Sequence, residues 1–229
     1  MSDYSLLAQT SDYLIINKAP GISVHRDQSD VGLLEQIRID LDCGPLYLVH
    51  RLDKMTSGLL LLACNAEAAS YLSRQFQERQ VDKYYLALSD QKPRKKQGLI
   101  KGDMERARRG SWKLSTTTNN PAITRFFSTS VEPGLRLFLL KPLTGKTHQL
   151  RVALKSIGAA IVGDERYHGV SAEPVDRGYL HAWALAFDWQ GERCEYLCDP
   201  DVGELYQRES VKQQLESWKP PGEQPWPTS

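Results

Sequence analysis

The chain has 229 residues, of which 41% are hydrophobic and 25% charged, and its formal net charge is +1. This composition is typical of a globular protein with one core, and four cysteines are too few for a disulfide framework at this length. No apolar run approaches the roughly 18 residues of a membrane span, and residues 1–12 lack the features of a signal peptide. We therefore expect a cytoplasmic protein without membrane partners.

Short strands and helices alternate along the first half of the chain. Residues 12–25 read as a short strand, an Asn-Lys-Ala-Pro-Gly turn and a second short run. Residues 31–41 have apolar side chains at helical spacing, and residues 46–53 and 57–64 read as two strands around a turn. Asn65 is expected to cap the helix that follows, and residues 82–89 read as a strand.

The second half predicts three more strands and one helix. Residues 121–128, 135–143 and 179–189 have strand-like patterns, while Thr147 is the expected cap of a helix that Gly158 ends. Many short strands without regular strand–helix alternation predict an α+β fold with a mixed, mostly antiparallel sheet flanked by helices. We expect a single domain over residues 1–218, with two sub-lobes around a cleft, and a flexible proline-rich tail over 219–229.

Positive charge is concentrated in one part of the sequence. Residues 92–163 carry 15 Lys and Arg against 3 Asp and Glu, a local net charge of +12. Within this block, residues 92–113 hold nine cations and two acids. A solvated surface loop and a contact surface for nucleic acid account equally well for such a run.

Two other patterns suggest sites but are incomplete. The sequence LTGKTH over residues 143–148 resembles the end of a phosphate-binding loop, but Leu140 stands where that loop needs a glycine. Cys194 and Cys198 have no second pair of ligands at metal-binding spacing. We therefore expect neither a nucleotide nor a metal.

The stretch HRLDKMTSGLLLLA over residues 50–63 places Asp53 between two cations, directly before the most apolar run. By itself such an Asp is more typical of a turn than of a catalytic site. The stretch, however, resembles the signature of the RluA family of pseudouridine synthases. The stretches NKAPGISVH, KPLTGKTHQLRVAL, and IVGDERYHG with YLHAWAL resemble further blocks of that family in the same order. The resemblance covers roughly residues 12–190.

The resemblance implies a pseudouridine synthase fold with a basic RNA-binding cleft, the catalytic domain only, and no metal or other cofactor. It implies that Asp53 is the nucleophile, that Arg151 pairs with it and lowers its pKa, and that Tyr85 stacks on the uracil. His50 and Thr56 are expected to support the loop. Two departures, the inserted Ala19 and the absence of the usual histidine-proline after LHA, bear on substrate choice.

The partner implied is RNA, either tRNA or a stem-loop of large-subunit (23S-type) ribosomal RNA, bound by a monomer. Arg51 is expected at the point where the flipped base leaves the helix, and Leu150 in the base pocket. Within the basic block, Arg106, Arg108 and Arg109 are expected to contact phosphates. An inactive RNA-binding protein on the same scaffold is the main alternative, and a glycosidase with paired carboxylates is a second.

Overall fold

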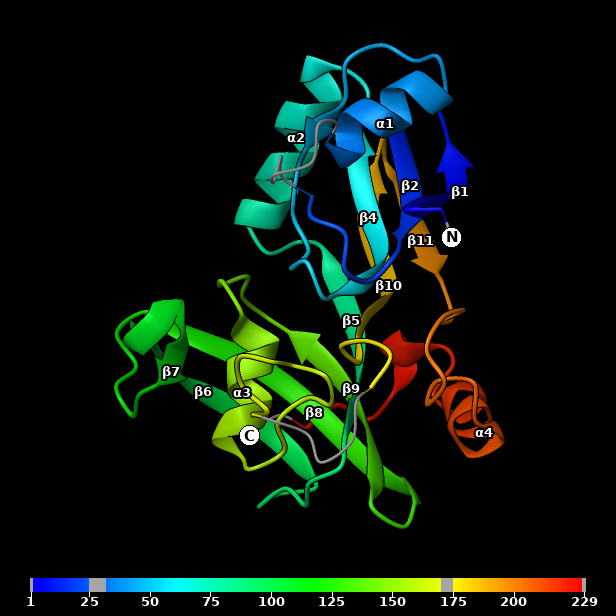
Figure 1. Ribbon diagram of the computed structural model, residues 1–229. Helices are drawn as coiled ribbons and strands as arrows, with labels where there is room; N and C mark the ends of the chain where they lie inside the picture. The colour runs from blue at the N-terminus through cyan, green and yellow to red at the C-terminus, as the bar shows by residue number, and fades with distance from the viewer. Residues whose placement is uncertain (1, 25–31, 170–174, 228–229) are drawn as a thin grey trace. The chain divides into compact units, whose positions relative to one another are not determined.

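The computed structural model describes residues 2–24, 32–169 and 175–227 (Figure 1). Among these residues the structure has four α-helices, two short 3-10 helices and eleven β-strands. The chain forms two compact units. Unit 1 comprises residues 1–82 and 182–199, and unit 2 comprises residues 83–181 and 200–229. The expected single domain over residues 1–218 stays a prediction.

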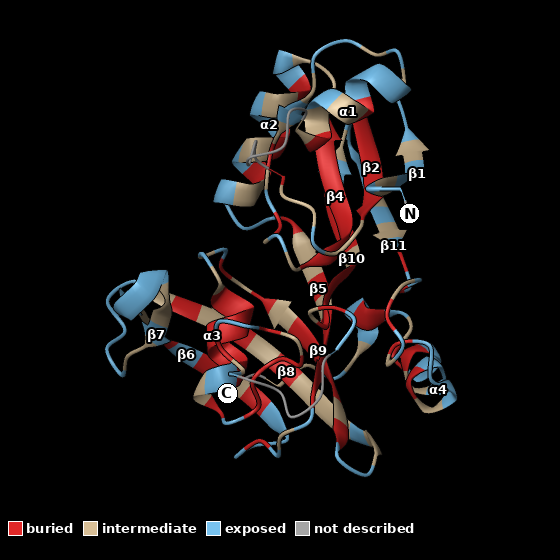
Figure 2. Cartoon of the chain, in the orientation of Figure 1, coloured by how far each residue is buried: buried red, intermediate tan, exposed pale blue. Residues whose placement is uncertain are grey.

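Unit 1 is built on a sheet whose inner strands are almost entirely apolar. Its strand order is β1-β2-β4-β10, with β3 pairing β4 and β11 pairing β10. The strands are β1 (Tyr4–Gln9), β2 (Tyr13–Lys18), β3 (Tyr47–Leu48), β4 (Ser57–Ala63), β10 (Leu180–Trp189) and β11 (Glu192–Leu197). Every residue of β2 and β4 is buried, as Figure 2 shows. Continuous apolar runs are what strands covered on both faces require.

Two helices complete unit 1. Helix α2 (Ala66–Gln77) begins at the predicted cap, because the Asn65 side chain accepts a hydrogen bond from the backbone N–H of Ala68. Helix α1 (Leu33–Asp40) confirms the predicted helix and buries Leu33 and Ile37. Residues 25–31, which include the start of that predicted helix and the end of the preceding run, lie outside the described residues.

Unit 2 contains a second set of strands, in the order β5-β9-β8-β6-β7. Its strands are β5 (Asp82–Ser89), β6 (Gln97–Arg106), β7 (Trp112–Leu114), β8 (Pro121–Glu132) and β9 (Leu135–Pro142). The pairings β5–β9, β9–β8, β8–β6 and β6–β7 are all antiparallel. Helix α3 (Gln149–Ser156) buries six consecutive residues, Gln149 to Leu154, so its first turns are enclosed on all sides.

The basic block differs from the loop that its charge suggested. Residues 97–106 form strand β6, and a 3-10 turn over Arg108–Gly110 joins it to β7. We call residues 97–114 the basic hairpin. Along β6 the buried positions are Gly98, Ile100 and Gly102, so two of the three inward positions carry no side chain and the alternation is hidden in the sequence.

The end of the chain has a defined place in unit 2. Helix α4 (Glu209–Ser217) is followed by a 3-10 turn over Pro221–Glu223. The Trp226 ring lies 5.7 Å from the Tyr84 ring and 5.0 Å from the Phe127 ring, centroid to centroid. The tail predicted to be flexible is thus described up to residue 227, and its Trp226 contacts two aromatic residues of the sheet. Its flexibility stays a prediction, and motion would require these aromatic contacts to open.

Candidate active site

Asp53 lies in the turn that leads into the buried strand β4. Its carbonyl oxygen accepts the backbone N–H of Thr56 at 2.9 Å, which closes the turn. Thr56 and Ser57, at the end of that turn, are 2% and 3% exposed, whereas Asp53 is half-buried and Arg51 is exposed. The turn therefore has a rigid base while its carboxylate remains within reach of solvent.

A fully buried ammonium group holds this turn from beneath. The Nζ atom of Lys18 lies 2.8 Å from the carbonyl oxygens of Ala19 and Ile22, and 3.4 Å from that of Lys54. The Lys54 carbonyl also accepts the backbone N–H of Gly21 at 2.9 Å. A buried charge is tolerated only when hydrogen bonds compensate for lost water. The Asn-Lys-Ala-Pro-Gly turn is thus tied to the residue after Asp53.

Gly58 and His50 also fix the surroundings of the turn. Gly58 has φ +101°, and a Cβ atom there would lie 2.2 Å from the carbonyl oxygen of Ala182, so only glycine fits. The Nε2 atom of His50 accepts the backbone N–H of Leu61 at 2.9 Å, and its ring stacks on Phe76 at 4.5 Å. These contacts give His50 a supporting place beside β4.

In unit 2, Arg151 forms a buried bidentate ion pair that the sequence did not predict. Its Nε and Nη2 atoms donate to the two carboxylate oxygens of Asp164, each at 2.8 Å. The Asp164 side chain is fully buried and that of Arg151 is 10% exposed. The guanidinium is therefore held by one edge in a fixed plane. The pairing of Arg151 with Asp53, a residue of unit 1, stays a prediction.

Gln149 holds in place the loop over residues 143–148, which resembled a phosphate-binding motif. The side-chain oxygen of Gln149 accepts hydrogen bonds from the Thr144 hydroxyl at 2.7 Å and from the backbone N–H of Lys146 at 3.1 Å. Its amide nitrogen donates to Ile123 and Thr124 of β8, both at 3.0 Å. All four hydrogen bonds are internal, so the Gly-Lys-Thr segment is a braced connection to α3. The residue at the cap position of α3 is His148, one residue after Thr147, the predicted cap.

Tyr85 and Leu150 occupy ordered positions in unit 2. Tyr85 lies opposite Leu140 in the β5–β9 pairing and is half-buried, whereas its neighbour Tyr84 is 5% exposed. The Tyr84 hydroxyl accepts a hydrogen bond from Lys141 at 3.1 Å. Leu150 is 7% exposed on α3. The roles predicted for Tyr85 and Leu150 toward uracil stay predictions.

The arginines of the basic hairpin gather at its tip. Arg106, Arg108 and Arg109 are all exposed. The backbone N–H of Ala107 donates to Ser111 at 2.8 Å and closes the tip, while Arg109 takes a left-handed conformation with φ +55°. Three cations are therefore presented on a closed turn, an arrangement suited to phosphate contacts.

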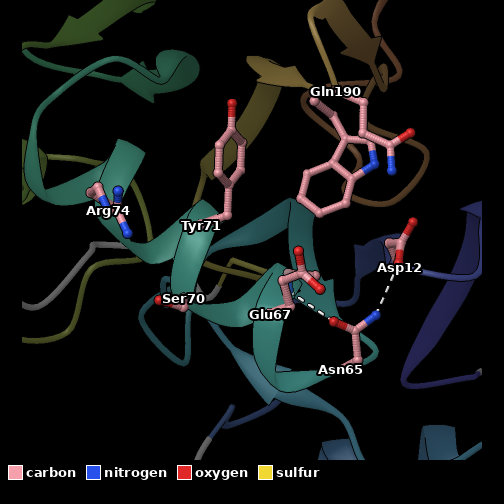
Figure 3. A pocket seen from close by; sticks show the side chains of 9 residues that line it. Asp12, Asn65, Glu67, Ser70, Tyr71, Arg74 and Gln190 are labelled. Carbon is pink, nitrogen blue, oxygen red and sulfur yellow. Dashed lines mark hydrogen bonds between the residues drawn. The ribbon is translucent and has the colours of Figure 1, made fainter.

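A separate hollow of about 520 Å³ lies on unit 1 beside α2 (Figure 3). Its lining includes the acids Asp12 and Glu67 against the single cation Arg74, which is unsuited to a phosphate. Asn65, also in the lining, donates to Asp12 at 2.9 Å while it caps α2. Within the described residues, the lining includes none of the side chains predicted for the site.

Two further structural findings concern the described residues. No group of three or more His, Cys, Asp or Glu side chains gathers there at a distance that would hold a metal ion. None of the helices in residues 2–24, 32–169 and 175–227 has the length and apolarity of a membrane span.

Comparisons with known proteins place the chain in a family. Residues 12–156 match the family described as RNA pseudouridylate synthase. An "Uncharacterized RNA pseudouridine synthase" of Haemophilus influenzae is 54% identical over 214 residues, which cover 93% of this chain and 95% of that protein. The chain belongs to the RNA pseudouridylate synthases, and the predicted resemblance to the RluA group is confirmed. It is therefore an isomerase that modifies RNA.

Two more relatives support this assignment. The "Ribosomal large subunit pseudouridine synthase C" of Rickettsia bellii is 33% identical over 191 residues, which cover 77% of this chain and 61% of that protein. The solved structure of "Human RNA Pseudouridylate Synthase Domain Containing 1" matches with a TM-score of 0.75 and 28% identity, covering 93% of this chain and 94% of that one. The predicted α+β pseudouridine synthase fold is confirmed, while the basic cleft stays a prediction.

Proposed function

We propose that this enzyme converts specific uridines of structured RNA to pseudouridine, with Asp53 as nucleophile and with no metal or other cofactor. The name of the Rickettsia relative favours large-subunit ribosomal RNA as the substrate. Transfer RNA is the alternative outcome of the mapping experiment below. We further propose that the enzyme acts as a monomer.

The reaction is an isomerisation within one nucleotide. The bond from the sugar C1′ to uracil N1 breaks, the base turns, and C1′ joins C5. The hydrogen on C5 leaves to solvent, and N1 gains one. No electrons are exchanged with a second compound, so the reaction requires no redox partner. It does require an ionised carboxylate beside the sugar.

The observation that carries the proposal is the setting of Asp53. Its turn is closed by the Asp53–Thr56 hydrogen bond and anchored through the Lys54 carbonyl to the buried Lys18, while the carboxylate stays half-buried. A residue that only formed a turn would not need this anchoring. A nucleophile does, because a displacement of about 1 Å can cost 10²-fold in rate.

We assign residues of unit 2 to two tasks: pairing with the charge of Asp53 and contacting the uracil base. Arg151, held by Asp164, is assigned to pair with Asp53 and to balance its negative charge. Tyr85 stacks on the flipped uracil, and Leu150 supplies an apolar wall. These three roles depend on the proposed reaction at Asp53.

Exposed cations are assigned to the RNA backbone. Arg51 occupies the space left by the flipped base, where its planar guanidinium stacks better than an ammonium group. Arg106, Arg108 and Arg109 of the basic hairpin contact phosphates and form part of a basic cleft. Unstacked loops are the favoured targets, since flipping a paired base costs a few kcal/mol.

The test replaces Asp53 by Asn, which keeps the shape but loses the anionic nucleophile. We expect tritium release from C5-labelled uridine in bulk ribosomal and transfer RNA to fall by at least about 10³-fold, with RNA affinity kept. The RNA comes from cells that lack this protein. The control is Asp12→Asn, in another surface carboxylate of unit 1, which should retain full activity.

Two results would contradict the proposal. Substantial release by folded Asp53→Asn protein would remove the nucleophile assignment. RNA binding by the wild-type protein without any release would support the inactive RNA-binding alternative. Mapping pseudouridines in both RNA classes, from cells with and without the protein, identifies the substrate.

A further inference from the structure

Residues 161–169, with the sequence IVGDERYHG, form a compact segment of unit 2 around the buried carboxylate of Asp164. The backbone N–H groups of Arg166 and Tyr167 donate to its Oδ1 atom at 3.1 and 3.2 Å. The same carboxylate holds Arg151 in the bidentate pair. One side chain therefore fixes both the course of this segment and the plane of the guanidinium.

The ring of Tyr167 lies against two cations of helix α3. The Arg151 guanidinium carbon is 5.0 Å from the ring centroid, and the Lys155 ammonium is 5.7 Å away. Tyr167 is only 3% exposed and Arg151 is also buried, so their cation–π contact forms in a largely dry environment, whereas Lys155 is exposed. Arg151 is thus fixed by Asp164 at one edge and by the Tyr167 ring over its face.

The hydroxyl of the same tyrosine points to a different element. It accepts the backbone N–H of Trp112, the first residue of β7, at 2.9 Å. It also shares a 2.9 Å hydrogen bond with Nδ1 of His148. Burial raises the pKa of Tyr167, so the hydroxyl keeps its proton at neutral pH. A single side chain therefore touches both the basic hairpin and Arg151.

A second contact joins the hairpin to this segment. The Arg166 guanidinium donates to the carbonyl oxygen of Arg109 at 2.6 Å, at the tip that presents Arg108 and Arg109. The hairpin is tied to the 161–169 segment at its tip and at the start of its second strand. Figure 1 shows β6, β7 and α3 in the same part of unit 2.

We propose that Tyr167 is a positioning residue that couples the RNA-contacting hairpin to Arg151. Its hydroxyl sets the hairpin, and its ring sets the guanidinium. RNA bound by the hairpin arginines is thereby placed in register with the residue that serves Asp53. This inference rests on the proposed function, because it takes Arg151 and the hairpin in the roles assigned above.

A purely packing role would not require the hydroxyl. The ring alone fills the space beneath the guanidinium, and phenylalanine would fill it equally well. The hydroxyl is needed only if the position of Trp112, and with it the hairpin, matters to the enzyme. The two ends of the side chain can therefore be separated by substitution.

The test compares Tyr167→Phe with Tyr167→Leu in the tritium-release assay on bulk ribosomal and transfer RNA. Tyr167→Phe keeps the ring and leaves the Trp112 N–H without its acceptor. We expect the apparent KM to rise roughly three- to tenfold while kcat stays within about twofold. Tyr167→Leu also removes the ring over Arg151, and kcat should fall as well, by about tenfold or more.

The matched control is Tyr179→Phe. The Tyr179 hydroxyl also accepts a backbone N–H, that of Leu205 at 3.1 Å, and also bonds a second side chain, Asp176. The backbone N–H of Tyr179 donates to Val162 of the 161–169 segment, but its hydroxyl bonds Asp176 and Leu205, which have no role assigned in the site. Tyr179→Phe should lower the melting temperature about as much as Tyr167→Phe and leave KM unchanged.

A second measurement tests the coupling directly. Replacing Arg108 and Arg109 by Ala should raise KM less in the Tyr167→Phe background than in the wild type, because the hairpin is already displaced. Equal and additive effects, or a KM for Tyr167→Phe equal to that of Tyr179→Phe, would overturn the inference. An inactive wild type would instead overturn the proposed function, so the two failures are distinguishable.

Discussion

The two units anchor their parts of the candidate site with buried charges of opposite sign. In unit 1 the ammonium of Lys18 is surrounded by carbonyl oxygens of residues 19, 22 and 54. In unit 2 the carboxylate of Asp164 faces the Arg151 guanidinium and the backbone N–H groups of residues 166 and 167. Backbone dipoles surround the first charge, and a full opposite charge faces the second.

The difference bears on what each anchor controls. Lys18 donates to three backbone carbonyl oxygens, so it sets the path of the chain next to Asp53. Asp164 binds a side chain that carries a proposed role, so it sets the direction of one functional group. Removing Lys18 should therefore lower stability and slow the reaction as far as the Asp53 turn shifts, whereas removing the charge of Asp164 should lower stability and displace a functional side chain directly.

The largest effect on stability is expected for Asp164→Asn. The amide oxygen can still accept the N–H groups of residues 166 and 167, but the buried Arg151 loses its counter-charge. Breaking a buried ion pair on one side costs about 3–5 kcal/mol, and a displaced guanidinium should slow the reaction by about 10²-fold. Chemical denaturation and single-turnover tritium release measure the two quantities on the same protein.

Glu132→Gln is the control for this variant. Glu132 pairs with Arg208 in the same unit, but the two side chains are 31% and 46% exposed. Hydrogen bonds from Ser210 and Arg208 lower the pKa of Glu132, so the substitution also removes one negative charge. Such exposed ion pairs contribute little to stability, because water screens them. Equal losses from Asp164→Asn and Glu132→Gln would contradict the importance given to burial.

A smaller effect is expected for Lys18→Met, which keeps the length of the side chain. It removes the Nζ donor from the carbonyl oxygens of Ala19 and Ile22 while avoiding a cavity. The Lys54 carbonyl keeps the Gly21 N–H. We expect a loss of about 2–3 kcal/mol in unfolding free energy, near the upper end for unsatisfied polar groups. Lys54→Met, in the exposed neighbour of Asp53, should stay within about 0.5 kcal/mol. If Lys18→Met lost as much stability as Asp164→Asn, the distinction between anchoring by backbone dipoles and anchoring by an ion pair would be removed.

The strands and helices that the sequence predicts best are those with strong periodicity. The apolar run at residues 57–63 and the Asn65 cap produce β4 and α2 where expected. The strand expected over residues 46–53 shortens to Tyr47–Leu48, because the rest of that segment is the loop that carries Asp53. In the basic hairpin, glycines occupy two of the three buried positions of β6, so hydrophobic alternation gives no signal there.

Three other supporting residues of the site escaped prediction for a different reason. Lys18, Gln149 and Asp164 act through contacts with distant or backbone partners, and no local pattern marks a buried polar group. Asp164 and Arg151 are thirteen residues apart, and their pairing depends on how residues 157–163 fold back onto α3. The glycine at position 163 was the available hint in the sequence that this segment is tightly packed. In the structure Gly163 has φ +75°, and a Cβ atom there would lie 2.0 Å from the carbonyl oxygen of Arg177.

The smallest effect on stability is expected for the hairpin arginines, whose charges are exposed where those of Lys18 and Asp164 are buried. Replacing Arg106, Arg108 and Arg109 by Ala should change the unfolding free energy by less than about 1 kcal/mol. If these arginines bind phosphates of a single-stranded RNA segment, the slope of log affinity against log salt should shrink by roughly 0.7 for each phosphate that is no longer neutralised. Filter binding of bulk ribosomal RNA between low and moderate salt measures the slope. Lys212→Ala, at an exposed position of α4, is the control for removing a surface cation elsewhere in unit 2. An unchanged slope in the triple variant would mean that the hairpin charges are only solvated, and the coupling assigned to Tyr167 would then have no RNA contact to transmit.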